Sequence, residues 1–349
     1  MGASLRTGVS LLAAVLLSGC ETLAYYAQAI GGQLSLMSRA RPVETLLADP
    51  ATPQALRERL ALARSIREFA AQELKLPDNR SYRNYAELDR PSVVWNVVAA
   101  AEFSLEAVKS CFPVAGCVSY RGFFARDDAE RHAQGLRASG HDVYLYGVPA
   151  YSTLGRFDDP LLSTFIRYPD AELARLVFHE LAHQVVYVRD DSTFNESFAV
   201  AVEREGVRRW LAATGRAAEL GAVLELQERN ARFLSEIEQS RARLQALYGM
   251  ALSPERMRQR KKLELEFLGE RLKGNARLKG ISPNNAVLAS FATYTQLVPA
   301  FEKLLADEGG NLERFYARVK ALGAGGVRGL SPASVIEPSN RGPLSARRP

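Results

Sequence analysis

The sequence predicts an α+β fold that is mainly helical, with a small mixed or antiparallel sheet and a long charged helical hairpin. Apolar residues recur three and four positions apart in the N-terminal third and through much of the C-terminal half, which indicates amphipathic helices. Between these regions, four short runs are rich in β-branched and aromatic residues, as strands are. The chain has 349 residues, of which 47% are hydrophobic and 24% charged, which is typical of a folded protein with a sizeable core.

The N-terminal third is expected to be helical and to lead into the sheet. Residues 21–49 have a mostly helical pattern, and residues 51–76 have a stronger one, with Thr52 as N-cap and Pro53 in the first turn. A further short helix is predicted at residues 127–140. The four strand-like runs lie around it, at residues 83–89, 92–103, 117–125 and 142–153.

Two helices and a hairpin are predicted in the C-terminal half. The two helices, at residues 170–189 and 195–213, are joined by a brief polar link. The hairpin spans residues 217–275, and in its turn Ser253 is placed to cap the second arm and Pro254 to open it. Two arms of similar length can bury each other, so a packed hairpin is favoured over a coiled coil that binds a partner.

A short apolar run near the N-terminus predicts an export signal. Residues 9–17 form an apolar run, interrupted by Ser10, that is too short to span a bilayer, and the small residues Ser18 and Gly19 stand directly before Cys20. The stretch "LSGC" is similar to the lipobox of bacterial lipoproteins, which implies removal of residues 1–19 and acylation of Cys20. Several lipid chains would then anchor the protein to a membrane. An ordinary signal peptide with an incidental cysteine is the alternative.

Export also bears on location and on the other two cysteines. The lipoprotein resemblance implies a bacterial cell envelope protein that faces the periplasm, at the outer membrane because Glu21 is no inner-membrane retention signal. Periplasmic thiols are normally oxidised, so Cys111 and Cys117 are predicted to form a disulfide around a bend made by Pro113 and Gly116. A zinc knuckle is the rival interpretation, but no second cysteine pair exists to complete it.

The charge pattern argues against a nucleic-acid partner. The formal net charge is +6 and the sequence pI is about 9.2. However, Lys and Arg alternate with Asp and Glu over most of the length, which is typical of a solvated surface rather than a basic patch.

The most informative motif is "FHELAHQVVYV", which begins at Phe178 and holds two of the four histidines of the chain. His179 and His183 lie four residues apart, so on a helix both imidazoles can face one zinc ion. Glu180 projects about 100° further round the helix and can hold a metal-bound water. Zinc lowers the pKa of such a water to about 7, and the carboxylate accepts its proton. Two ordinary core histidines are the alternative, but burying His, Glu and His without a partner would cost several kcal/mol.

A catalytic zinc needs a third protein ligand, for which Glu196 is the first candidate. It follows His183 by thirteen residues, near the start of the next predicted helix, so that helix can fold back against the first. The alternative is a capping box in which Thr193 and Glu196 bond only to backbone amides. Glu203 and Asp191 are the reserve ligands.

Peptide hydrolysis would also need a donor for the oxyanion that develops on the scissile carbonyl. Tyr294, on a predicted helix near the C-terminus, is the first candidate. Tyr187, four residues beyond His183, is the competing donor. Either tyrosine can equally be a packing residue. Arg121 can bind a substrate carboxylate or pair with a surface acid.

These motifs together resemble one family. The segments "LSGC", "CFPVAGCVSYRGFF", "FHELAHQ", "FNESFAVAVE" and "NNAVLASFATYTQLVPAF" occur here in the order found in bacterial predicted zinc aminopeptidases that carry lipoprotein signals. The resemblance implies a zincin-like peptidase domain at residues 20–328, with the hairpin as an insertion and residues 329–349 as a flexible tail. It also implies a Zn²⁺ cofactor, a peptide substrate and a lipid-anchored enzyme. The Gly-x-Met-Glu-Asn segment with which gluzincin aminopeptidases bind the substrate amine has no counterpart, so exopeptidase and endopeptidase action both stay open.

By analogy with zincins, the edge of the strand within residues 142–153 is expected to hold the substrate backbone as an added strand. A different class of function is also open. In that alternative the chain is a non-catalytic envelope lipoprotein, whose zinc is structural and whose hairpin binds a partner.

Overall fold

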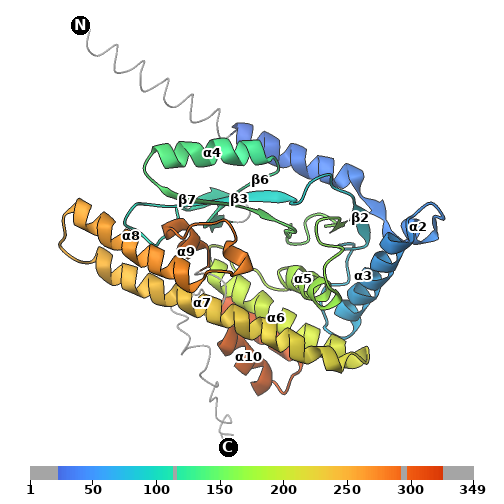
Figure 1. The fold of residues 1–349 in the computed structure, drawn as a ribbon. Helices are drawn as coiled ribbons and strands as arrows, with labels where there is room; N and C mark the ends of the chain where they lie inside the picture. The colour runs from blue at the N-terminus through green and yellow to red at the C-terminus, as the bar shows by residue number, and fades with distance from the viewer. Residues whose placement is uncertain (1–22, 113–115, 292–296, 325–349) are drawn as a thin grey trace, which may run out of the picture.

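The computed structural model describes residues 23–112, 116–291 and 297–324, and it confirms a mainly helical α+β chain with small sheets (Figure 1). Residues 23–39 are helical, followed by short α2 and long α3. Helices α4 and α5 follow strands along the chain, and the C-terminal half is made of helices. Their bounds are α2 Val43–Ala48, α3 Gln54–Gln72, α4 Arg126–Ala138, α5 Asp170–Ala182, α6 Ser192–Ala213, α7 Leu220–Tyr248, α8 Pro254–Arg271, α9 Asn285–Phe291, α10 Val298–Asp307 and α11 Leu312–Ala324, with 3-10 turns η1 Ala217–Glu219 and η2 Ala276–Leu278.

The described strands form three small sheets rather than one. The first has the order β1-β2-β8, with β1 antiparallel and β8 parallel to β2, the second is antiparallel with the order β6-β3-β7, and the third is the hairpin β4-β5. The predicted run at 117–125 therefore splits between two sheets. The strand bounds are β1 Arg41–Pro42, β2 Asn84–Ala86, β3 Val94–Ala100, β4 Ser110–Phe112, β5 Gly116–Val118, β6 Arg121–Phe123, β7 Asp142–Val148 and β8 Leu161–Leu162.

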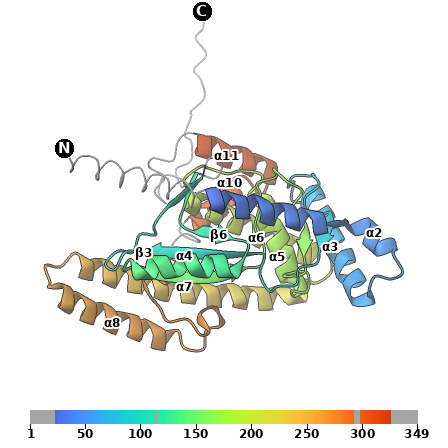
Figure 2. The same cartoon turned by 90° about the horizontal axis from the view of Figure 1, so that it is seen from above.

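The sheet β6-β3-β7 is covered by helices on both faces. Helices α4 and α9 both contact β3, and Figure 1 shows them on opposite sides of it. The helix of residues 23–39 lies on the same side as α4, as the view from above in Figure 2 also shows. Because both faces are covered, β3 is apolar almost throughout and most of its residues are buried. Strand β7 is left as an edge of this sheet.

The main core lies where α5 and α6 pack against each other and against α3. Gly206 of α6 makes the close approach possible, because a Cβ there would lie 2.7 Å from the Phe178 ring and 2.8 Å from Leu74 Cδ1. The N-cap expected for α3 is wrong. Pro53 occupies the N-cap position with extended backbone and no side-chain cap, so Thr52 stands one residue outside the helix.

The predicted charged hairpin is present as α7 and α8, which lie side by side (Figure 2). Phe233, Ile237 and Leu244 of α7 and Leu268 of α8 are buried in one cluster, which continues into Val98 of β3. The Ser253 side chain accepts a hydrogen bond from the Arg256 N–H at 3.4 Å and so caps α8 as predicted. The two arms therefore bury each other and also pack onto the sheet.

Candidate metal centre

Helix α5 presents one face to the core and the other to a cleft. Leu173, Val177 and Leu181 are fully buried in the core. His179 lies one turn before His183, which is the C-cap residue of α5. The helix ends at Ala182 and not at residue 189 as the sequence predicts. The face shared by the two histidines consequently does not continue to Tyr187.

Asn195 fixes the segment that follows the helix. Its Oδ1 accepts a hydrogen bond from the Val188 N–H, and its Nδ2 donates to the Val188 carbonyl, both at 2.7 Å. Asp191 caps α6 by accepting from the Phe194 N–H at 2.8 Å. This loop turns the chain back, so that α6 packs against α5. Because Asp191 is the N-cap, the capping-box alternative for Thr193 is wrong.

The fold brings three side chains to one point. His179 Nε2 and His183 Nε2 are 3.2 Å apart, and Glu196 oxygens lie 3.4 Å from His179 Nε2 and 3.8 Å from His183 Nε2. Two nitrogens bound to one zinc ion, each at about 2.0–2.1 Å and at a tetrahedral angle, lie about 3.4 Å apart. The separations fit a shared ion, and this group of His179, His183 and Glu196 could hold a metal.

Glu203 lies behind His179 rather than at the shared point. Its Oε2 is 2.8 Å from His179 Nδ1 and 3.1 Å from Arg175 Nη1. Arg175 also pairs with Glu172 at 2.9 Å. A carboxylate on the second ring nitrogen fixes the orientation of a metal-binding histidine. The reserve ligands of the sequence analysis thus have other positions, Glu203 as the partner of His179 and Asp191 as a helix cap.

The electrostatics of the site favour a cation. Burial alone would lower the pKa of His179, but hydrogen bonds and charge from Glu196 and Glu203 raise it to about 10. For His183 the effect of burial exceeds that of the nearby carboxylates and lowers the pKa to about 4. The two carboxylates thus stabilise one positive charge where the imidazoles meet, and a metal dication can take that place. The Nδ1 of His183 is buried without a partner among the described residues.

Glu180 lies beside this group and lines the same cleft. Burial raises the pKa of Glu180 to about 7, with the charge on Glu196 adding to the effect and His179 opposing it. A carboxyl with a pKa near neutrality can both accept and return a proton at physiological pH. The role of Glu180 as the proton acceptor stays a prediction.

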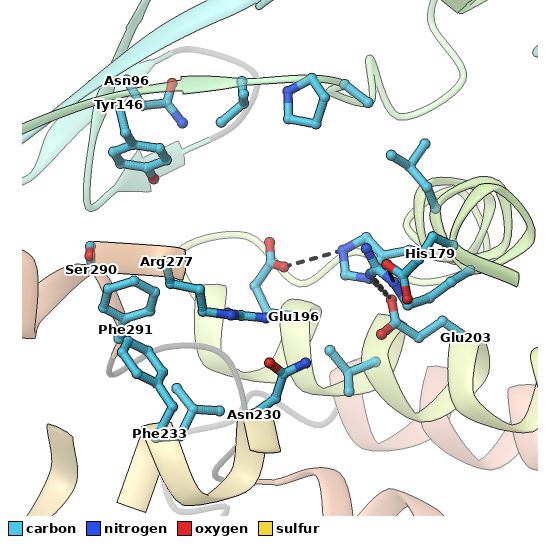
Figure 3. A pocket seen from close by; sticks show the side chains of 18 of the residues that line it. Asn96, Tyr146, His179, Glu196, Glu203, Asn230, Phe233, Arg277, Ser290 and Phe291 are labelled. Carbon is cyan, nitrogen blue, oxygen red and sulfur yellow. Dashed lines mark hydrogen bonds and ion pairs between the residues drawn. The ribbon is translucent and has the colours of Figure 1, made fainter. Parts of the chain in front are cut away.

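A cleft of about 1670 Å³ opens in front of the histidines. Figure 3 shows Asn96 and Tyr146 of the sheet on one side, His179 on another, and Asn230 and Phe233 of α7 on a third. The hairpin thus forms part of the cleft wall.

The other residues singled out in the sequence lie in different places. Tyr294 lies outside the described residues, as does Cys20. Tyr187 lines the cleft from the loop between α5 and α6. The guanidinium of Arg121 lies 4.1 Å from the ring centroid of Tyr25. Cys111 and Cys117 are joined by a disulfide across the β4-β5 pair.

Two tyrosines that the sequence analysis did not consider lie near the acids of the site. Tyr120 lines the cleft and is 39% exposed, but the cleft walls desolvate its hydroxyl and, together with the charge of Glu196, raise its pKa. The Tyr82 hydroxyl is buried without a partner among the described residues, and the charge of Glu180 adds to the burial that raises its pKa. Both residues come from segments far from the histidines in sequence, and no spacing pattern connects them.

Fold and site together define a mainly helical α+β protein with a two-histidine, one-glutamate group that could bind a metal at the wall of a large cleft. The profile of the family described as "Putative aminopeptidase" matches residues 24–328. The chain belongs to this family, which indicates a peptidase. Comparison with curated proteins and comparison with solved structures each found no match.

Proposed function

We propose that the chain is a zinc-dependent peptidase of zincin-like fold, acting as an aminopeptidase in the bacterial cell envelope. One observation carries the proposal. His179, His183 and Glu196 converge at one point of the cleft, with the half-buried acid Glu180 beside them. Two imidazoles and a carboxylate form the donor set of many catalytic zinc sites. Membership of the aminopeptidase family supports the same conclusion.

The number of ligands favours catalysis over a structural zinc. Structural zinc sites are closed by four protein ligands, whereas catalytic sites use three and keep one position open. Within residues 23–112, 116–291 and 297–324, the candidate group has three members and faces the cleft. The alternative of a non-catalytic lipoprotein with a structural zinc is therefore less well supported.

The side chains around the group have complementary roles in peptide hydrolysis. Zinc held by the three ligands would supply a Lewis acid that polarises a carbonyl and makes water more acidic. Glu180, with its pKa near neutrality, accepts a proton from the attacking water and returns it to the leaving amine. Tyr120 and Tyr187 line the cleft as hydroxyl donors for the developing oxyanion, and Tyr294 stays a candidate from the sequence.

Strand β7 is proposed to hold the substrate backbone. It is an edge strand among the described residues, and Tyr144, Tyr146 and Val148 line the cleft. An extended peptide can add to such an edge through main-chain hydrogen bonds, with its side chains in the adjoining pockets.

The envelope location is proposed from the N-terminal sequence. Acylation at Cys20 would anchor the protein, and the disulfide between Cys111 and Cys117 suits an oxidising compartment such as the periplasm. Within the described residues, no helix is long and apolar enough to cross a membrane. The division into a peptidase domain at residues 20–328, with the hairpin as an insertion, stays a prediction.

The variant Glu180→Gln tests the mechanism. It should bind zinc as the wild type does and lose peptide cleavage by at least about 100-fold, because the amide cannot accept the proton. The control is Glu238→Gln, which removes another acid that lines the cleft and should leave cleavage within about twofold. Metal content by elemental analysis and cleavage of a peptide library with free and blocked N-termini are the measurements. Undiminished cleavage by Glu180→Gln would refute the mechanism, and equal cleavage of blocked peptides would refute the aminopeptidase assignment.

A further inference from the structure

The cationic side chains that line the cleft are paired with acids, with one exception. Within the described part of the chain, each of the others has a carboxylate within the ion-pair distance. The pairs are Arg175 with Glu172 and Glu203, Arg204 with Glu302, Arg229 with Glu225, Arg232 with Glu228, Arg271 with Glu236 and Lys273 with Glu270. Arg277 also lines the cleft, but no described acid pairs with its guanidinium and no described group accepts a hydrogen bond from it.

Arg277 is held at a defined place in the cleft wall. It belongs to the turn η2, and its backbone N–H donates to Asn275 Oδ1 at 3.0 Å. The guanidinium carbon lies 5.8 Å from the centroid of the Phe233 ring on α7. Figure 3 shows the side chain extending into the cleft on the side of Glu196. The residue is solvent-exposed, yet the surrounding walls desolvate its guanidinium and lower its pKa, and Arg175 adds to the effect.

The acids whose charges act on Arg277 are paired with other side chains. The charges of Glu172 and Glu203 act on Arg277, which places it within electrostatic reach of the metal centre. Both acids, however, are already bound to Arg175, and Glu203 also to His179. A guanidinium has five N–H donors in a planar fork that matches a carboxylate in two hydrogen bonds. The guanidinium of Arg277 therefore has donors available for a carboxylate of a molecule that enters the cleft.

An aromatic wall beside Arg277 suits the rest of such a ligand. The rings of Phe233 and Phe291 pack edge to face with centroids 5.0 Å apart, and Tyr144 stacks on Tyr146 at 4.6 Å. Phe291 joins the two pairs, because its centroid lies 6.5 Å from that of Tyr144. All four line the cleft, so an apolar portion of a ligand can pack there while its charged end reaches Arg277.

We infer that Arg277 is a specificity-determining residue that binds a carboxylate of the peptide substrate, with the aromatic wall of Phe233, Phe291, Tyr144 and Tyr146 beside it. This inference rests on the proposed peptidase function and names the substrate class. The carboxylate can be the C-terminus of a short peptide or an acidic side chain within a longer one. Both present the same planar anion to the guanidinium.

Four matched peptides distinguish these sources. Their common sequence has either an acidic residue or its amide counterpart at one position, and the C-terminus is either free or amidated. Hydrogen bonds to a charged group typically change affinity by about 10-fold to 100-fold. The wild type should cleave the carboxylate-bearing peptides with a kcat/KM that is higher by that factor. A preference for the acidic residue identifies a side-chain carboxylate as the group bound, and a preference for the free C-terminus identifies the terminal carboxylate. Arg277→Gln should abolish the preference and leave the fully neutral peptide within about twofold.

The control variant is Arg232→Gln, which removes one positive charge from the same cleft and should keep the preference. A preference that survives Arg277→Gln, or a loss of the same size for all four peptides, would overturn the inference. Calorimetric measurement of the binding of the four peptides shows whether the inference about Arg277 or the proposed peptidase function is wrong. A carboxylate preference in binding without any cleavage refutes the peptidase and supports Arg277, whereas cleavage without preference refutes Arg277 alone. If the peptides are neither bound nor cleaved, both are refuted.

Discussion

Replacing Glu203 by glutamine tests whether the metal centre is oriented from behind His179. In the structure, Glu203 Oε2 accepts from His179 Nδ1 at 2.8 Å and pairs with Arg175 at 3.1 Å. Glutamine keeps one acceptor oxygen but loses the charge and places an amide donor near Arg175. The imidazole then loses its anionic partner, which weakens it as a ligand and frees its ring to rotate.

The expected effect of Glu203→Gln is a fall in zinc affinity of about 10-fold to 100-fold, equivalent to about 1.4–2.7 kcal/mol. Because Glu203 is not one of the three converging ligands, binding should weaken rather than disappear. The measurement is a competition titration in which a chromophoric chelator takes zinc from the protein. Cleavage at saturating zinc should fall less than cleavage at limiting zinc.

The matched control is Glu205→Gln on the same helix. Glu205 forms surface ion pairs with Arg208 and Arg209, both at 2.7 Å, and has no bond to a histidine. Its zinc affinity should stay within about twofold of the wild type. The reasoning is refuted if Glu203→Gln retains wild-type affinity. It is also refuted if both variants lose zinc equally, which would indicate general loosening of α6.

Two further predictions concern stability. Gly206→Ala should lower the free energy of unfolding in urea by about 1–3 kcal/mol, because the added methyl would clash with Phe178 and Leu74; a loss below about 0.5 kcal/mol would contradict the close approach of α5 and α6. Burial raises the pKa of the Asp159 carboxyl to about 6 from an ordinary 3.8. The folded state therefore binds the proton more tightly than the unfolded state does. The stability that Asp159 contributes is fully present below about pH 3.8 and is lost as the pH rises through 6, by up to about 3 kcal/mol. Asp159→Asn should remove that part of the pH dependence in urea titrations at pH 4 and pH 7, and an unchanged dependence would rule out Asp159 as its source.

Features encoded over short distances could be predicted from the sequence. The helical periodicities predict α3 to α8 apart from their ends, and the cap at Ser253 follows from a single turn of sequence. The spacing of His179 and His183 places both imidazoles on one face of a helix. The position of Glu196 near the histidines could be predicted because only thirteen residues separate it from His183, a distance short enough for the next helix to fold back against the first.

Features that depend on distant partners could not be predicted. Residues 185–188 continue an apolar helical pattern, but the Asn195 side chain binds the backbone of Val188 and the helix ends at Ala182. The run at 117–125 divides between β5 and β6 because each half pairs with a different strand. Tyr120 and Arg277 reach the cleft from segments on either side of the histidines, and only the folded chain brings them there.

The turn held by Asn195 has a consequence for how the protein matures. All three candidate ligands lie between His179 and Glu196, so only a short loop has to close to assemble them. Such a loop closes much faster than the sheets β1-β2-β8 and β6-β3-β7, whose strands are farther apart in sequence. An ion captured by the newly paired helices would stabilise that pairing while the rest of the chain is still unfolded. Availability of the metal during synthesis would then govern the yield of folded protein as well as its activity.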